Sequence, residues 1–267
     1  MSDSELQAQT EAATAYENLF IAALFGEWAP RVIAAARLEA GERVLDVACG
    51  TGILARAAAA RVGPRGFVAG LDANPGMLAV AGRLAPQVAW RQGKAESLPY
   101  PDASFDVVVS QFGLMFFSDR GQALREMLRV LVPGGRLAVA VWDSLEHTPA
   151  YAIEVAVLER IAGRAAADAL RAPFVLGDRD ELAAVFTGAG IAAPTITTHR
   201  GLGQFPSLRV MVEADLCGWL PVMNIMLTEK QVEAVLAEAE RALRPYVTTD
   251  GSVVFDSPAH IVTATKA

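Results

Sequence analysis

The most constraining feature of this chain is a glycine-rich turn between an apolar stretch and an alanine-rich stretch. Residues 43–48 (RVLDVA) have the pattern of a short buried strand, residues 49–52 (CGTG) supply the turn, and a helical pattern follows as far as Ala60. Glycine lets the backbone turn tightly and brings its N–H groups close to a ligand, at the start of a helix. This order predicts an α/β protein with a small-molecule site at the turn.

The alternation of strand and helix continues beyond the turn. We predict further strands at residues 66–71, 88–92, 105–110 and 136–142, and helices at residues 75–84 and 121–131. Each predicted strand is a near-continuous apolar run, which is typical of a parallel sheet covered by helices on both faces. We therefore expect a doubly wound, Rossmann-like α/β fold.

The two flanking regions have a different pattern. Residues 5–38 are predicted to be helical, with a break at Pro30. The second half of the chain combines predicted helices with a predicted sixth strand and a final strand pattern: helices at residues 151–170, 180–189, 208–220 and 228–246, and strands at residues 195–199 and 251–266. We divide the chain into an N-terminal helical segment (1–40), a core (41–205 and 250–267) and a helical insertion (206–249).

Composition excludes several classes of protein. The formal net charge of -7, with no basic cluster, argues against a nucleic-acid partner. Two cysteines, Cys49 and Cys217, make neither a disulfide framework nor a metal cluster, so no metal is expected. Residues 1–10 do not resemble a signal peptide, and the longest uncharged apolar run, residues 216–227, is too short to span a bilayer. We expect a cytoplasmic protein without a membrane span.

The glycine turn is compatible with two kinds of cofactor. Residues 50–55 satisfy the dinucleotide pattern G-x-G-x-x-A, and Asp72 follows Gly50 by 22 residues, where a ribose-binding acid is expected. An NAD(P)-dependent oxidoreductase is therefore an open alternative. However, Asp46 lies at the tip of the first strand, and no basic residue lies between Asp46 and Arg56. This charge pattern disfavours a pyrophosphate and favours S-adenosylmethionine, which carries an ammonium, a sulfonium and a carboxylate.

Five motifs occur in a fixed order along the chain. They are VLDVACGTG (44–52), GLD (70–72), GKAESLPY (93–100), SFDVVVSQFGL (104–114) and LVPGGRL (131–137). Together they resemble the successive motifs of class I S-adenosylmethionine-dependent methyltransferases, in particular the branch of the ubiquinone and menaquinone C-methyltransferases (methyltransferase type 11). The resemblance covers roughly residues 40 to 145. It implies a seven-stranded sheet whose last two strands differ in direction from the others.

The resemblance also implies a set of cofactor-binding residues. The glycine turn would hold the methionine part, Asp72 the ribose, Lys94 and Ala95 the adenine, and Gln111 would lie under the cofactor. The full set expected to bind S-adenosylmethionine is Asp46, Ala48, Gly50, Thr51, Gly52, Asp72, Ala73, Lys94, Ala95, Glu96 and Gln111, with Tyr16 from the leading helices. Asp46 either contacts the ligand or braces the amides of the turn. Trp28, also on the leading helices, is a second candidate to close over the cofactor.

Two departures from the family pattern bear on this assignment. Lys94 stands where the family usually has Asp or Asn, and an ammonium cannot accept a hydrogen bond from the adenine amino group. That contact should fall to the backbone of Ala95 or to Glu96. The N-terminal Tyr-Asp signature of the quinone enzymes is absent from residues 16–28, which argues against a quinone acceptor.

The acceptor side is less well defined by the sequence. His147 follows the fifth strand, at the sheet edge where ligands bind, and is a candidate general base. The insertion is rich in large apolar residues, which could form plain core, a homodimer surface or a lid over a small, apolar acceptor; the position near the substrate side favours the lid. The predicted function is methyl transfer to a small molecule. The alternatives are the oxidoreductase or a protein that binds S-adenosylmethionine without transferring its methyl group.

Overall fold

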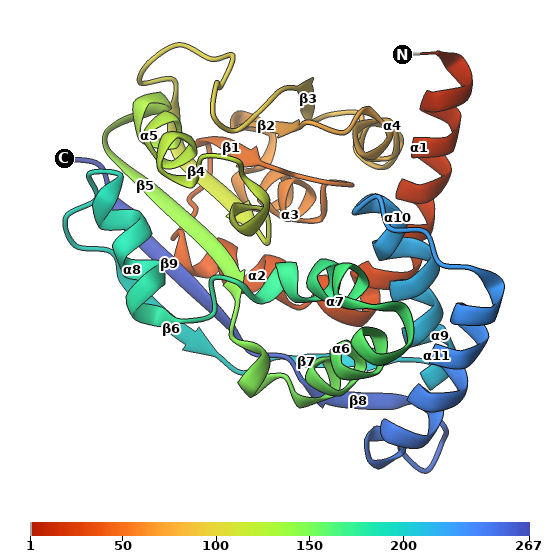
Figure 1. Cartoon of the computed structure of the whole chain (residues 1–267). Coiled ribbons are helices and arrows are strands. Elements are labelled where there is room, and N and C mark those ends of the chain that lie inside the picture. The colour runs from red at the N-terminus through yellow and green to blue at the C-terminus, as the bar shows by residue number, and fades with distance from the viewer. Residues whose placement is uncertain (1) are drawn as a thin grey trace.

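A seven-stranded mixed sheet forms the centre of the computed structural model, which describes residues 2–267 (Figure 1). The strand order is β3-β2-β1-β4-β5-β9-β6. The strands are β1 (Arg43–Val47), β2 (Phe67–Asp72), β3 (Ala89–Gln92), β4 (Phe105–Gln111), β5 (Leu131–Trp142), β6 (Thr195–His199) and β9 (Ala259–Thr265). Of the seven, β9 alone is reversed, since it pairs antiparallel with both β5 and β6. The expectation that the last two strands both differ in direction was therefore wrong for β6.

The central strands are buried on both faces because helices cover the sheet from both sides. Val44 and Leu45 of β1 and Val108 of β4 have no exposed surface, as near-continuous apolar strands predict. Helices α2 (Trp28–Ala35) and α3 (Ile53–Val62) pack together on one face, and α5 (Arg120–Val130) and α8 (Arg179–Gly188) pack together on the other (Figure 1). Helix α4 (Pro75–Leu84) contacts β2 and β3. The doubly wound Rossmann-like prediction is confirmed.

The N-terminal segment is helical throughout, but its break is not at Pro30. It consists of α1 (Asp3–Tyr16), the π-helical segment η1 (Glu17–Phe25) and α2. The chain turns at residues 26–27, and Pro30 lies in the first turn of α2. Backbone N–H groups in a first helical turn have no intrahelical partner, so a proline there removes no bond.

The second half of the chain differs from the sequence prediction at two points. The predicted helix at residues 151–170 is two helices, α6 (Pro149–Ala162) and α7 (Arg164–Arg171), because Gly163 has a φ of 90°. A short strand that the sequence analysis missed, β7 (Leu202–Phe205), pairs antiparallel with β8 (Val253–Asp256) outside the main sheet. The Gly251–Lys266 pattern is thus divided between β8 and β9.

The helical insertion begins and ends at this two-stranded sheet. Its elements are α9 (Leu208–Glu213), the π-helical segment η6 (Ala214–Trp219), α10 (Leu220–Val222), α11 (Glu229–Ala242) and the short helix η7 (Arg244–Tyr246). The insertion contacts α1 through η6 and contacts α6 through α11 (Figure 1). It therefore connects the first helix of the chain to the helices that follow β5.

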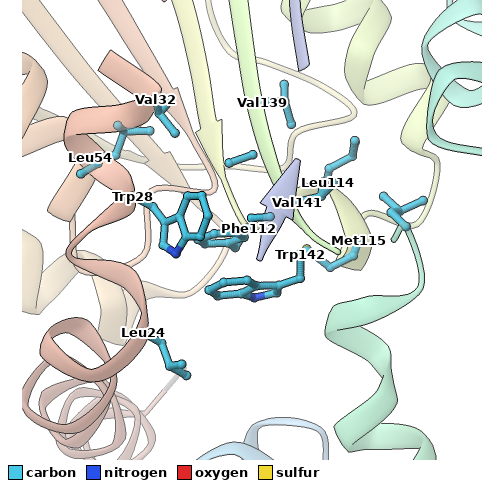
Figure 2. Close-up of a cluster of buried hydrophobic side chains, with 14 of the residues drawn as sticks. Leu24, Trp28, Val32, Leu54, Phe112, Leu114, Met115, Val139, Val141 and Trp142 are labelled. Carbon is cyan, nitrogen blue, oxygen red and sulfur yellow. The ribbon is translucent and has the colours of Figure 1, made fainter. Parts of the chain in front are cut away.

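An aromatic cluster fixes the carboxyl ends of β4 and β5 (Figure 2). Phe112 and Trp142 are stacked with ring centroids 3.7 Å apart, and Trp28 meets each of them edge-on at 5.8 Å. Trp28 is fully buried. It is a core residue without exposed surface, so the expectation that it closes over the cofactor was wrong.

Three further observations concern residues 2–267. Within this range no helix is both long enough and apolar enough to cross a bilayer. No group of three or more His, Cys, Asp or Glu side chains in the same range is arranged to hold a metal ion. Both cysteines are free, Cys49 buried and Cys217 exposed.

Candidate functional site

A cavity of about 540 Å³ opens at the carboxyl edge of the sheet, above the ends of β1, β2 and β4. Ligands of doubly wound proteins bind at this edge. The structure brings every predicted cofactor-binding residue except Gly52 to its wall: Tyr16, Asp46, Ala48, Gly50, Thr51, Asp72, Ala73, Lys94, Ala95, Glu96 and Gln111. We call it the main cavity.

Asp72 joins the turn after β1 to the turn after β2. One carboxylate oxygen accepts a hydrogen bond of 2.8 Å from the Gly50 amide, and the other accepts one of 2.8 Å from the Asn74 amide. Burial raises the pKa of this carboxyl, and the amide donors oppose the rise. Asp72 therefore shapes the turn as well as presenting a carboxylate to the cavity, a role that the sequence did not predict.

The backbone of the turn has the left-handed conformation that its glycines favour. Gly50 and Gly52 have φ values of 54° and 88°, and Ala48, with a side chain, has a φ of 58°. A Cβ atom added at Gly52 would lie 2.4 Å from the ring of Trp90. Gly52 thus faces Trp90 rather than the cavity, and its contribution is to let the turn pass over that ring.

Asp46 is the most unusual group in the main cavity. It is 1% exposed, and neither of its carboxylate oxygens has a hydrogen-bond partner in the described part of the chain. Burial raises the pKa of Asp46 well above its ordinary value; the backbone amide of Ala55, in the helix after the turn, opposes this rise in part, and the nearby Asp72 adds to it. Since no amide of the turn pairs with it, this geometry favours ligand contact over bracing. A cationic ligand group would satisfy both oxygens.

The N-terminal segment covers the main cavity. Tyr16 lies on its wall and stacks on Phe25, with ring centroids 5.4 Å apart. Burial and the Asp72 carboxylate raise the pKa of Tyr16, so its hydroxyl stays protonated near neutrality. Gln111 at the end of β4 donates a 3.0 Å hydrogen bond to the Phe25 carbonyl, and its own carbonyl oxygen is buried without a partner. Gln111 thus connects the sheet edge to this cover and retains a free acceptor.

The loop after β3 carries the residues expected at the adenine. Lys94 is exposed, and Ala95 is 5% exposed. The carboxylate of Glu96 accepts a 2.9 Å hydrogen bond from the Ser118 amide, so it already serves to hold the loop after β4. Two hydrogen-bond acceptors were expected for the adenine amino group, the backbone of Ala95 and the side chain of Glu96. Because Glu96 already accepts a hydrogen bond, the backbone of Ala95 is the better candidate.

His147 lies away from both cavities described in this section. Its side chain is 64% exposed, and its Nδ1 atom lies 3.0 Å from an oxygen of Asp143. The hydrogen bond to Asp143 raises the pKa of the imidazole, which favours the protonated ring over a free base. The structure therefore does not support His147 as a general base for this site.

A smaller chamber of about 90 Å³ adjoins the main cavity. Five side chains line both: Tyr16, Phe25, Phe112, Phe116 and Trp219. The others lining the smaller space are Phe20, Leu24, Trp142, Tyr151, Leu170, Pro173, Phe174, Asp215 and Ser257. We call it the aromatic chamber. The sequence analysis missed this chamber because its walls come from segments that are far apart in the sequence. The local signal that could have indicated it is an acidic residue, Asp215, next to an apolar helical stretch.

The insertion contributes a wall to each space. Trp219, Val222 and Met223 line the main cavity, and Trp219 also lines the aromatic chamber. The Trp219 indole donates a 2.9 Å hydrogen bond to the Ala169 carbonyl, and its ring lies 5.3 Å from that of Phe116. The apolar residues of the insertion are thus divided between core positions, such as the fully buried Leu220, and cavity-facing positions.

Comparison with known proteins places this geometry in context. Residues 45–139 match a family described as a methyltransferase domain. The chain is 41% identical over 118 residues to a demethylmenaquinone methyltransferase of Lactobacillus johnsonii, covering 42% of this chain and 48% of that protein. It is 47% identical over 119 residues to the ubiquinone/menaquinone biosynthesis C-methyltransferase UbiE of Ectopseudomonas mendocina, covering 42% and 46%. The chain spans about half the length of these curated relatives.

The similarity to solved structures extends over most of the chain, whereas the sequence similarity to the curated relatives covers 42% of it. The YcgJ protein of Bacillus subtilis superposes with a TM-score of 0.60 at 22% identity, covering 90% of this chain and 98% of that one. A phosphoethanolamine N-methyltransferase of Haemonchus contortus superposes with a TM-score of 0.61 at 17% identity, covering 96% and 57%. At this level of identity the likeness concerns the fold.

Proposed function

Since residues 45–139 form a class I, S-adenosylmethionine-dependent methyltransferase domain of the ubiquinone/menaquinone branch, we propose that this chain transfers a methyl group from S-adenosylmethionine to a small molecule. The observation that carries the proposal is Asp46, a buried carboxylate on the main cavity without a partner in residues 2–267. When bound, S-adenosylmethionine supplies a methyl group on a positively charged sulfur. Its cationic groups are the kind of partner that Asp46 lacks.

The residues of the main cavity fit this cofactor better than a nicotinamide dinucleotide. Three carboxyl groups line the described cavity, those of Asp46, Asp72 and Glu96, against one basic residue, Lys94. A pyrophosphate beside Asp46 and Asp72 would meet two carboxylates at the point where it needs hydrogen-bond donors. In our assignment Asp72 holds the ribose hydroxyls, and the amides of the turn hold the carboxylate of the methionine part.

The chain itself contributes alignment and exclusion of water. Apolar side chains from three separate segments, among them Phe25, Phe116 and Met223, enclose the space next to the turn. Displacement at a sulfonium methyl needs the two reacting atoms in line and a site closed to water. We assign the insertion (206–249) as the lid that closes this site over the acceptor.

The acceptor cannot be taken over from the relatives, because their similarity covers the cofactor half. The aligned stretches amount to 42% of this chain, and the family match ends at residue 139. The aromatic chamber is built mostly from residues outside that range. We place the acceptor there and propose a small molecule with an apolar body.

The test is a screen of small apolar acceptors with S-adenosylmethionine, reading out S-adenosylhomocysteine and the methylated product. We expect acceptor-dependent turnover in the native chain and loss of most of it in Asp46→Asn. Asp106→Asn is the matched control, since Asp106 lies at the amino end of β4, opposite the end that borders the main cavity, and forms an ion pair with Arg43. Cofactor binding without turnover on any acceptor would instead favour the non-transferring alternative.

A further inference from the structure

The aromatic chamber contains an acidic group that methyl transfer from the main cavity does not use. Asp215 of η6 lines the chamber and is 2% exposed, and its Oδ2 atom has no hydrogen-bond partner within residues 2–267. A second acid that interacts electrostatically with it, Glu154 of α6, is fully buried, and both of its carboxyl oxygens are unpartnered in the same range. We propose that the aromatic chamber binds an amine and that Asp215 holds its positively charged nitrogen.

The two acids interact with each other and with one hydroxyl. Burial raises the pKa of Glu154 to about 8, and burial together with Glu154 raises that of Asp215. The Tyr151 hydroxyl, also on the chamber wall, donates to Asp215. At neutral pH the raised pKa values favour the protonated form of both acids when no ligand is present. Asp215 is the member that faces the chamber, so an ammonium group bound there would favour its carboxylate form.

The described part of the chain places no positive charge beside this pair. The residues lining the described chamber include no Lys, Arg or His, and the ion pairs found in residues 2–267 do not involve Glu154 or Asp215. Burial of an uncompensated carboxylate is strongly unfavourable, so Asp215 becomes charged only beside a cation, and a bound ligand is the available source of one. A carboxylate or phosphate on the ligand would meet no positive charge among these lining residues.

The remaining wall also favours a cation. Nine aromatic side chains line the chamber: Tyr16, Phe20, Phe25, Phe112, Phe116, Trp142, Tyr151, Phe174 and Trp219. The face of an aromatic ring carries partial negative charge and attracts an ammonium group that has lost its water. A ring of such faces with one acid is a recognised arrangement for binding ammonium ligands. The acceptor class that fits is therefore a small amine with an apolar body.

The proposal rests on the proposed function only where it names this amine as the methyl acceptor; binding can be measured without cofactor. The probes are phenethylamine, phenethyl alcohol and phenylacetate, which share one carbon frame and differ in charge. Binding is read by calorimetry and by the fluorescence of Trp142 and Trp219, both on the chamber wall. We expect the amine to bind at least about tenfold more tightly than the alcohol, and phenylacetate not to bind.

Variants separate the contact residue from its neighbour. Asp215→Asn should weaken amine binding by about tenfold or more and leave the alcohol nearly unchanged, since only the charge is removed. Glu154→Gln should retain amine binding, because Asp215 then carries the charge alone. Asp102→Asn, at a side chain 78% exposed, is the control for loss of one carboxylate.

Equal binding of phenethylamine and phenethyl alcohol, or full affinity for the amine in Asp215→Asn, would overturn the proposal. Asp215→Asn should also melt no lower than the native chain, because it removes a buried carboxyl without a counterion; loss of amine binding only through unfolding would count against a binding role. Amine binding without S-adenosylhomocysteine formation leaves this site standing and refutes the proposed function, whereas turnover of phenols without amine binding does the reverse.

Discussion

The two halves of the candidate site are built in different ways. The main cavity is shaped by backbone: the turn after β1 has residues with positive φ, and Asp72 ties that turn to the next by two amide hydrogen bonds. The aromatic chamber is shaped by side chains, with rings from the N-terminal segment, the sheet edge and the insertion surrounding Asp215. We propose that the first half binds through a backbone conformation that few residues permit. The second would bind through shape and charge, which single substitutions can alter gradually.

The largest effect should come from the turn. Gly52→Val adds a side chain where Cβ alone would lie 2.4 Å from Trp90, at a φ of 88°. Backbone strain and overpacking of this kind cost about 4 kcal/mol together, which is a loss of cofactor affinity on the order of 1,000-fold if the turn moves. The measurement is calorimetric titration with S-adenosylhomocysteine.

Gly134→Ala is the matched control for this substitution. Gly134 has a φ of 76°, and a Cβ atom there would meet nothing within 4 Å. It should lower stability slightly and leave cofactor affinity intact. Undiminished affinity in Gly52→Val would show that the turn does not define the site.

The buried acids of the second half should appear in the pH dependence of stability. The pKa of Glu154 is raised to about 8 in the folded protein, against about 4.5 for an exposed glutamate. Between these values the unfolded chain loses a proton that the folded protein keeps, so stability falls as pH rises through this window. Glu154→Gln removes that loss, and should be more stable than the native chain by about 4 kcal/mol at about pH 8.

Denaturant unfolding at several pH values measures this difference. The advantage of Glu154→Gln should shrink as pH falls towards about 4.5 and be largely lost below that pH, where glutamate is protonated in both states. A difference between the two proteins that is constant with pH, or that grows in acid, would contradict the buried acid pair.

Substitution of Asp72 should have an intermediate effect on cofactor affinity. Asp72→Ala removes the carboxylate proposed for the ribose and also frees the amides of Gly50 and Asn74. The expected loss of cofactor affinity is about 1–3 kcal/mol. Asn74→Ala, which removes the cap of α4 but leaves the carboxylate, separates loop anchoring from ligand contact. Equal losses in both variants would mean that Asp72 acts through the loop alone.

The smallest effect should come from the helical insertion, which we propose to be a lid. Trp219→Ala and Met223→Ala remove cavity-facing apolar surface of the insertion, so the acceptor KM should rise about fivefold while cofactor affinity stays nearly unchanged. Met226→Ala is the control, because this side chain is 78% exposed. A dimer that becomes a monomer with normal acceptor kinetics would instead favour the interface reading of the insertion.

The contrast between the halves also explains what the sequence could predict. Helix α4 and strand β6 were predicted at their observed bounds, since Pro75 and the alternation at residues 195–199 are local signals. The positions of Asp46 and Asp72 at one cavity follow from parallel strands ending at a common edge. The meeting of Asp215 with Tyr151 depends on how the insertion packs against α6, which no local pattern specifies. The same limit misplaced His147, whose loop turns its ring towards Asp143.

The central claim is that the main cavity is built for S-adenosylmethionine rather than for a dinucleotide. It is tested most directly by calorimetric titration of the native chain with S-adenosylhomocysteine and, separately, with NADH. The account predicts saturable binding of S-adenosylhomocysteine that Asp46→Asn and Asp72→Ala both weaken, and no measurable binding of NADH. Binding of NADH that is tighter than that of S-adenosylhomocysteine would contradict it.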